Sequence, residues 1–239
     1  MFASNSFLRV GAVCSLLSAV TTSVLIFGPN PPAPDGFDAL QTLHENSLHL
    51  YKKWVLFLHP QGAFIAALAA GSLIAKRSPA LVVIALFYYA IWTITEITQQ
   101  AYLIDALNQM WRPAYLAAGV DDQAQWQTLI VGLRGISDSQ YFVLLFGFSI
   151  GSILMGLAFI REPGTAKVIG YINLAIGFMS LLAFTRYYLG FSGAGSFVQG
   201  WYTWLYPTVQ IGVRLLLGWW LFQQSMHLSS SMTPEKQMR

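Results

Sequence analysis

Residues 140–160 read QYFVLLFGFSIGSILMGLAFI, an uninterrupted apolar run with no charged side chain. An α-helix needs about 20 consecutive apolar residues to cross the hydrocarbon core of a bilayer. The run has that length, and it stops at the charged, helix-terminating stretch Arg161-Glu162-Pro163-Gly164. It therefore predicts a membrane-spanning helix.

Further apolar runs of similar length occupy most of the remaining chain. They cover residues 8–28, 54–75, 79–103, 167–189 and 201–222. The chain is 55% hydrophobic and only 10% charged, whereas soluble domains carry about 25% charged residues. The runs do not alternate with a period of two, as the strands of a transmembrane barrel would. We expect an all-α fold, a polytopic membrane protein with a bundle of six transmembrane helices. It would form one domain over residues 1–239, ending in a polar, disordered tail from residue 223.

The first run could also be read as a signal peptide. Signal peptides have an apolar core of about 7–15 residues and a small-x-small cleavage site. The run over residues 8–28 is longer and is followed by Asn30-Pro31-Pro32-Ala33-Pro34. We interpret it as a retained anchor.

Basic residues near the span ends predict the orientation, because cytoplasmic loops carry an excess of Lys and Arg. One side receives seven: Arg9, Lys76, Arg77, Arg161, Lys167, Lys236 and Arg239. The other receives five: Lys52, Lys53, Arg112, Arg134 and Arg186. Both short connections lie on the side with seven, so we expect both termini in the cytoplasm.

The long loop over residues 105–139 contains a helical pattern of its own. Asp121 and Asp122 would cap a short helix whose apolar face is formed by Trp126, Leu129, Ile130 and Leu133. Such a helix would lie on the bilayer surface or cover the bundle.

Two charged residues fall inside predicted spans, where charge is expensive and suggests function. Glu96 lies outward of the middle of the third span, and Arg214 lies near the middle of the sixth. The offset between them along the membrane normal is about 9 Å at 1.5 Å per residue. A long arginine side chain covers much of that, so we expect a Glu96–Arg214 pair, direct or through Gln210.

Other polar residues predict a cavity or a network around this pair. The whole candidate set is His59, Thr93, Glu96, Gln99, Gln100, Arg186, Gln210 and Arg214. One reading is a cavity open to the outside, with Glu96 as proton acceptor and Arg214 or Arg186 holding an anion. The other reading is a satisfied polar network that fixes helix register.

Glycines inside the apolar runs favour close helix packing. Gly147-Phe148-Ser149-Ile150-Gly151 matches the nucleophile elbow of serine hydrolases, but that motif needs a strand, a turn and a helix. Within a membrane helix, glycines four residues apart let another helix approach. We assign Gly147, Gly151, Gly170 and Gly177 to helix packing.

The sequence offers no convincing catalytic or metal site, and we expect no cofactor. His44 and His49 are five residues apart, so on a helix they cannot face one metal ion. Gly190-Phe191-Ser192-Gly193 looks like the serine motif of rhomboid proteases. Such a serine needs a histidine base, and only His59 is a remote candidate. The single cysteine, Cys14, can form no internal disulfide. The dispersed basic residues do not indicate nucleic-acid binding.

Short motifs resemble the bacterial six-helix membrane proteins of the domain-of-unknown-function family 4386. They are Arg9-Val10-Gly11 in the first helix, Glu96 in the third span, and the stretch 206–221 in the last helix. The chain departs from the family pattern at Gln210-Ile211, where the family tends to show Gln-Glu. Another departure is Thr93, where it has an arginine. The resemblance implies six spans and a bacterial inner membrane location, and it implies no activity.

Three classes of function remain open; we favour the first, and the absence of a catalytic constellation puts the enzyme last. The first is a non-enzymatic accessory or sensor-type membrane protein, which acts with a membrane-protein partner or as a homo-oligomer. The second is a small-solute or proton-coupled transporter with an outward-facing cavity around Glu96, Arg214 and His59. The third is an intramembrane enzyme. A wet cavity that reaches Glu96 from outside favours transport, and a dry, fully paired Glu96 favours a structural role.

Overall fold

A computed structural model describes residues 4–32 and 34–231, and every regular element in these residues is a helix. Six helices are long: α1 (Asn5–Phe27), α3 (Ser47–Ile74), α4 (Pro79–Tyr102), α6 (Val120–Phe159), α7 (Thr165–Tyr188) and α9 (Trp201–Ser231). The short elements are α2 (Phe37–Gln41), η1 (Thr42–Glu45), η2 (Leu103–Trp111), α5 (Arg112–Ala117), η3 (Ser192–Ala194) and α8 (Gly195–Gln199). The predicted all-α fold is confirmed.

Five helical segments are long and apolar enough to cross a membrane: α1, α3, α4 with its continuation through α5, α6, and α7. The surface of α1 has the inside-out pattern of a membrane helix. Val10, Val13, Leu17 and Val20 are each at least half exposed. The opposite face buries small and polar residues, such as Ser15. Large apolar side chains on the outside and small or polar ones on the inside are typical of a helix in lipid.

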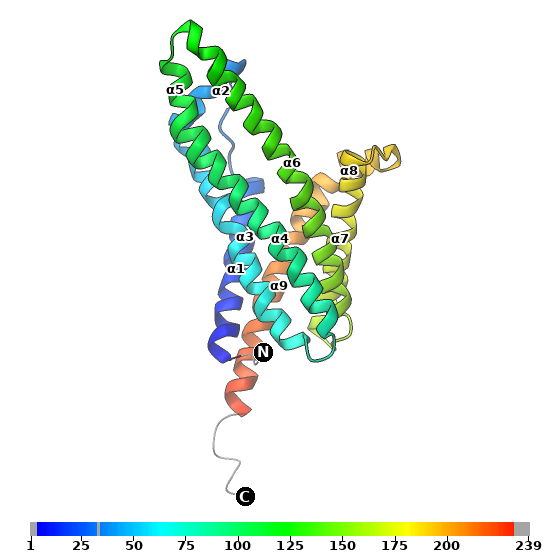
Figure 1. Ribbon diagram of the computed structural model, residues 1–239. Helices are drawn as coiled ribbons and strands as arrows, with labels where there is room; N and C mark the ends of the chain where they lie inside the picture. The colour runs from blue at the N-terminus through cyan, green and yellow to red at the C-terminus, as the bar shows by residue number, and fades with distance from the viewer. Residues whose placement is uncertain (1–3, 33, 232–239) are drawn as a thin grey trace, which may run out of the picture.

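The six long helices form a closed ring. In ring order they are α1, α3, α4, α6, α7 and α9, and each has its main contacts with its two neighbours. The least extensive of the six contacts is the one between α7 and α9. The beginning of α1 and the end of α9 lie at the same end of the ring (Figure 1). There the Asn5 Nδ2 donates a hydrogen bond of 2.7 Å to the Ser229 Oγ. We call this the terminal end, and the opposite end, with α2, α5 and α8, the hairpin end.

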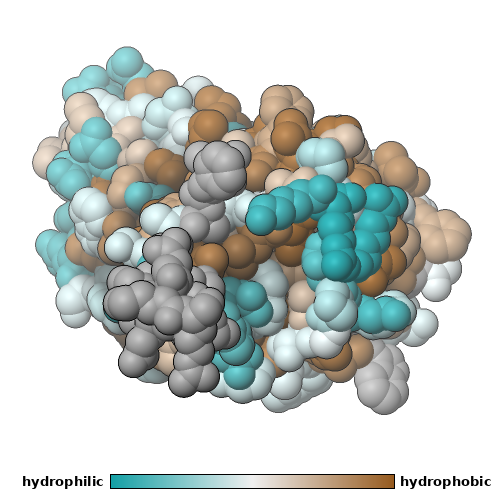
Figure 2. Space-filling view, turned by 90° about the horizontal axis from the view of Figure 1, so that it is seen from below, coloured by the Kyte–Doolittle hydropathy of each residue, from teal (hydrophilic) through white to brown (hydrophobic). Residues whose placement is uncertain are grey.

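Two tight loops are tied together at the terminal end. The Arg77 guanidinium lies 3.4 Å from the Glu162 carboxylate, and it donates to the Arg161 carbonyl at 3.2 Å. Seen from this end, a group of strongly hydrophilic side chains stands against a hydrophobic background (Figure 2). The two loops therefore form a polar cap on an apolar bundle.

The long loop predicted over residues 105–139 is an extended helical hairpin. α4 continues through the π-helical η2 into α5, and α6 begins at Val120 as one helix of 40 residues. At 1.5 Å per residue α6 is about 60 Å long, about twice the thickness of a hydrocarbon core. The prediction of a separate short helix is therefore wrong. Gly132 and Gly135 weaken a helix but do not end one. The predicted short helix and the predicted span over residues 140–160 are therefore one continuous helix.

The apolar face of that hairpin packs on the protein itself. Ile130 and Leu133 are buried against Leu107 and Tyr115, with Trp126 beside them. Leu129, predicted on the same face, is instead exposed.

The glycines assigned to helix packing lie at contacts within the chain. A Cβ on Gly147 or Gly151 would meet α4, at the Tyr88 carbonyl and the Tyr89 ring respectively. Gly170 and Gly177 of α7 lie against α6, within 3.0 Å of its backbone for a built Cβ. α7 runs unbroken through both glycines, and α9 runs unbroken through Pro207. These small residues close the ring, and they do not form an exposed face.

The last helix, α9, is longer than the apolar run over residues 201–222 from which it was predicted. α9 continues to Ser231, so residues 223–231 are helical where the sequence predicted an irregular tail. Residues 232–239 of the predicted tail lie outside the described residues.

Candidate functional site: a polar cavity inside the ring

A cavity of about 340 Å³ opens in the hairpin-end half of the ring, between α1, α3, α4, α6 and α9. We call it the Arg214 cavity. Its polar lining residues are Thr22, His59, Glu96, Gln210 and Arg214. Its wall is otherwise apolar and aromatic, formed by Leu25, Ile26, Leu56, Trp92, Tyr141, Leu144, Leu145, Phe148, Tyr202 and Tyr206. The cavity therefore combines a polar floor with an apolar wall.

Arg214 is the cation of this cavity and is only 9% exposed. Its Nη2 donates to the Gln210 Oε1 at 2.9 Å, one helical turn away on α9. Its Nη1 lies 3.0 Å from the His59 Nε2 of α3. The Arg214 backbone carbonyl accepts a bond of 2.7 Å from the Ser15 Oγ of α1. Three helices thus hold the arginine in place.

The hydrogen bonds fix the protonation of His59. Arginine can only donate, so the His59 Nε2 must be an acceptor without a proton. The proton of the neutral ring is then on Nδ1, which lies 2.7 Å from the Thr21 Oγ1. The Thr21 hydroxyl donates in turn to the Leu17 and Ser18 carbonyls, at 3.1 Å each. His59 is therefore a neutral support for the guanidinium.

The direct ion pair predicted between Glu96 and Arg214 is not formed. The ion pairs seen between described residues are elsewhere, such as Arg77–Glu162 and His44–Glu45. The Arg214 guanidinium bonds His59 and Gln210 instead. Glu96 lines the same cavity and is 8% exposed. The buried arginine thus has neutral hydrogen-bond partners only.

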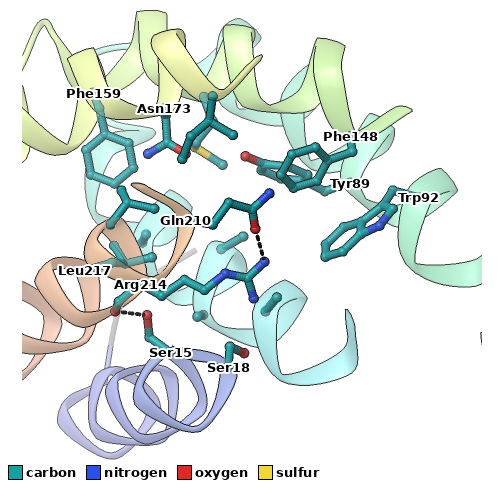
Figure 3. A pocket seen from close by; sticks show the side chains of 17 residues that line it. Ser15, Ser18, Tyr89, Trp92, Phe148, Phe159, Asn173, Gln210, Arg214 and Leu217 are labelled. Carbon is teal, nitrogen blue, oxygen red and sulfur yellow. Dashed lines mark hydrogen bonds between the residues drawn. The ribbon is translucent and has the colours of Figure 1, made fainter. Parts of the chain in front are cut away.

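A smaller chamber of about 70 Å³ lies on the other side of the arginine. Figure 3 shows Arg214 and Gln210 pointing into it, with Ser15 and Ser18 from α1 and Asn173 from α7 around it. The Ser18 hydroxyl is buried and has no hydrogen-bond partner among the described residues. A cavity needs at least about 10–15 Å³ to hold one water molecule, so the chamber is large enough to hold water. Gln210 and Arg214 line both spaces, so they form the partition between them.

The remaining predicted residues lie outside the Arg214 cavity. Gln99 donates to the Ser137 carbonyl and hydroxyl of α6, at 2.7 and 2.9 Å, and Gln100 donates to Gln99 at 3.3 Å. Thr93 is buried, with no partner for its hydroxyl in the described part of the chain. Arg186, predicted as a possible anion holder, lies at the end of α7 beside Gly195. The structure therefore brings together His59, Glu96, Gln210 and Arg214, and leaves the other four apart.

The serine of the nucleophile-elbow match and the histidine pair make structural contacts. The Ser149 hydroxyl is buried and bonds the Leu145 carbonyl of its own helix at 2.7 Å. The His44 Nδ1 lies 2.8 Å from the Gln41 carbonyl, whereas His49 contacts Arg112. Within the described ranges no three His, Cys, Asp or Glu side chains gather as metal ligands would.

We expect a Thr21→Val substitution to lower the free energy of unfolding by about 1 kcal/mol, because it leaves the His59 Nδ1 proton without an acceptor. Thr98→Val is the matched control, since the exposed Thr98 hydroxyl bonds only the Ile94 carbonyl of its own helix. Urea or thermal unfolding in detergent measures both variants. Equal stability of the two would contradict the assigned support of His59.

No protein-family model matches the chain, and no curated protein and no solved structure matches it. The resemblance to the family 4386 proteins stays a prediction. Function must be argued from the cavity itself.

Proposed function

We propose that the chain is a cell-membrane protein with six spans and both termini in the cytoplasm. An even number of spans is supported by the two chain ends, which lie together at the terminal end. The loops at that end hold Lys76, Arg77 and Arg161, as expected of a cytoplasmic face. α9 would supply the sixth span, because it packs along α1, whose far side is apolar and exposed. The hairpin end then faces outward.

Within this membrane protein, we propose that the Arg214 cavity binds a small organic anion and carries it across the bilayer. One observation carries the proposal. Arg214 is a buried cation in an outward-facing cavity, and its hydrogen-bond partners, His59 and Gln210, are both neutral. A buried charge is costly unless it is paired. Glu96 lines the same cavity but does not touch the guanidinium, so an anionic ligand would supply the direct ionic partner that Arg214 lacks. The guanidinium fork suits a carboxylate.

The cavity wall supports an anion with an apolar body. The volume of about 340 Å³ is near the lower end of small-molecule sites, which run from about 300 to 1,000 Å³. Side chains such as Leu144, Leu145 and Phe148 cover much of the wall. A carboxylate on Arg214 would leave its hydrocarbon part against them. The proposed ligand class is therefore a monovalent aromatic or short-chain carboxylate.

Two features support passage beyond binding. The smaller chamber continues the space past Arg214 toward the terminal end, with Ser15, Ser18 and Asn173 in a mostly apolar lining. The contact between α7 and α9 is also the least extensive of the six contacts that close the ring, and Arg214 lies on α9. A shift of α9 would therefore move the partition between the two spaces. A sensor would need only the binding step.

Naphthoate is a suitable probe, with naphthylmethanol and naphthylmethylammonium as neutral and cationic counterparts of the same shape. We expect the protein in lipid nanodiscs to bind naphthoate and not its two counterparts. In sealed vesicles, we expect unlabelled naphthoate inside to drive uptake of labelled naphthoate. Equal binding of all three compounds, or of none, overturns the anion site. Selective binding without exchange across the vesicle would retain the site and replace the carrier with a sensor.

A further inference from the structure

A second pocket lies closer to the hairpin end, and it is electropositive. It measures about 390 Å³ and lies between the α1–α2 connection and the start of α3. We call it the Lys53 pocket. Its charged lining residues are Lys52 and Lys53, with His49 beside them, and no carboxylate lines it among the described residues. The Lys52 Nζ is tied to the Asn30 side chain at 2.6 Å and the Gly28 carbonyl at 3.1 Å.

A buried arginine lies behind this pocket. Arg112 is 5% exposed, and its Nη1 lies 3.3 Å from the His49 Nε2 and also donates to the Asn108 Oδ1. Its Nε is buried without a hydrogen-bond partner in the part of the chain described. The positive charge of Arg112 lies close enough to interact electrostatically with both His49 and Lys53. Because arginine only donates, the His49 Nε2 is an acceptor and the ring adds no positive charge of its own.

Arg112 and Arg214 are held in the same way. Each bonds an amide four residues earlier on its own helix, Asn108 or Gln210, and each contacts a histidine of α3 through the Nε2 atom. In both cases the partners that hold the guanidinium are neutral. His49 and His59 are separated along α3 by about 15 Å at 1.5 Å per residue. The fold thus places two buried arginines one above the other along α3, and neither forms a direct ion pair within the described residues.

The two pockets share part of their lining. Leu25 of α1 and Leu56 of α3 line both the Lys53 pocket and the Arg214 cavity. These two leucines are therefore an apolar partition between an outer positive site and an inner one. A pocket lined by one sign of charge concentrates counter-ions and speeds their association.

We propose that the Lys53 pocket is an outer anion site, from which the organic anion passes between Leu25 and Leu56 to reach Arg214. This inference rests on the proposed function and adds a route and a basis for selecting anions. Lys53 supplies a positive charge that is free to meet an anion, because it lines the pocket half-buried and no hydrogen bond or ion pair holds it within the described residues. Arg112 adds positive potential from behind His49.

Stopped-flow binding of naphthoate to nanodisc-embedded protein tests the route. We expect Lys53→Gln to lower the association rate constant about fivefold at low salt and to weaken its salt dependence. Lys167→Gln is the control, since it makes the same charge change on an exposed residue at the terminal end. We expect Leu56→Ala to raise the association rate constant and the dissociation rate constant together, because it removes half of the apolar partition between the two pockets.

The outcomes separate the two proposals. If naphthoate binds in an Arg214-dependent manner but Lys53→Gln and Leu56→Ala leave both rates within twofold of wild type, the outer site is wrong and the cavity stands. If naphthoate does not bind the wild-type protein at all, both proposals fall. Slower association in Lys53→Gln but not in Lys167→Gln supports the outer site.

Discussion

Replacing Arg214 with glutamine should weaken naphthoate binding about 100-fold or more. The substitution removes the cation and the two N–H donors proposed to hold the carboxylate. Hydrogen bonds to charged groups contribute about 1.5–3 kcal/mol each, and about 2.8 kcal/mol corresponds to a factor of 100. Arg214→Lys keeps the charge without the fork, so we expect an intermediate loss. Isothermal calorimetry in nanodiscs measures these affinities.

The control for this variant is Arg186→Gln. Arg186 lies at the hairpin end of α7 and does not line the Arg214 cavity, so its loss should leave naphthoate affinity within twofold. The free energy of unfolding of Arg214→Gln should fall little, because removing a buried charge that has no direct ion pair also removes its desolvation cost. Weak binding in both variants would indicate general electrostatic attraction and not a site.

Replacing Glu96 with glutamine should have the opposite effect, and tighten naphthoate binding about tenfold, or about 1.4 kcal/mol. Glu96 and Arg214 line one cavity without touching. An ionised Glu96 repels an anion bound at Arg214, and a protonated Glu96 does not. Anion binding should therefore take up a proton in the wild-type protein, and affinity should fall as the pH rises. In Glu96→Gln this pH dependence should disappear.

The matched control is Glu162→Gln at the terminal end, where the carboxylate pairs with Arg77. Affinities are compared over a pH range in which naphthoate itself stays ionised. Should Glu96→Gln bind more weakly than wild type, Glu96 would be a direct ligand contact and the proposed coupling would be wrong. If the naphthoate affinity of the wild-type protein did not depend on pH, the predicted uptake of a proton by Glu96 would be wrong.

The helices could be read from the sequence because hydrophobicity and helix ends are local properties. Residues 79–103 and 167–189 were predicted within two residues of α4 and α7. The length of α6 could not be read, since Arg134 and Asp138 interrupt the apolar pattern without ending the helix. Charge marks where a helix leaves lipid, and it does not mark where the helix stops.

The members of the site were predicted better than their pairing. Depth along the membrane normal placed Arg214 near Glu96, but rotation about each helix axis decides which side chains meet. The structure turns Arg214 toward His59 and Gln210. Thr21 and Ser15 were missed because serine and threonine in apolar helices usually bond their own backbone, so neither gives a signal at long range. Arg112 was read only as a loop charge, since its partner His49 is 63 residues away.

The most direct test of an anion at Arg214 is a structure of the protein with bromonaphthoate, located by the anomalous scattering of bromine. We predict bromine density in the Arg214 cavity against its apolar wall, with the carboxylate within hydrogen-bond distance of the Arg214 guanidinium. An empty cavity at saturating bromonaphthoate, or a carboxylate that faces away from Arg214, would contradict the account.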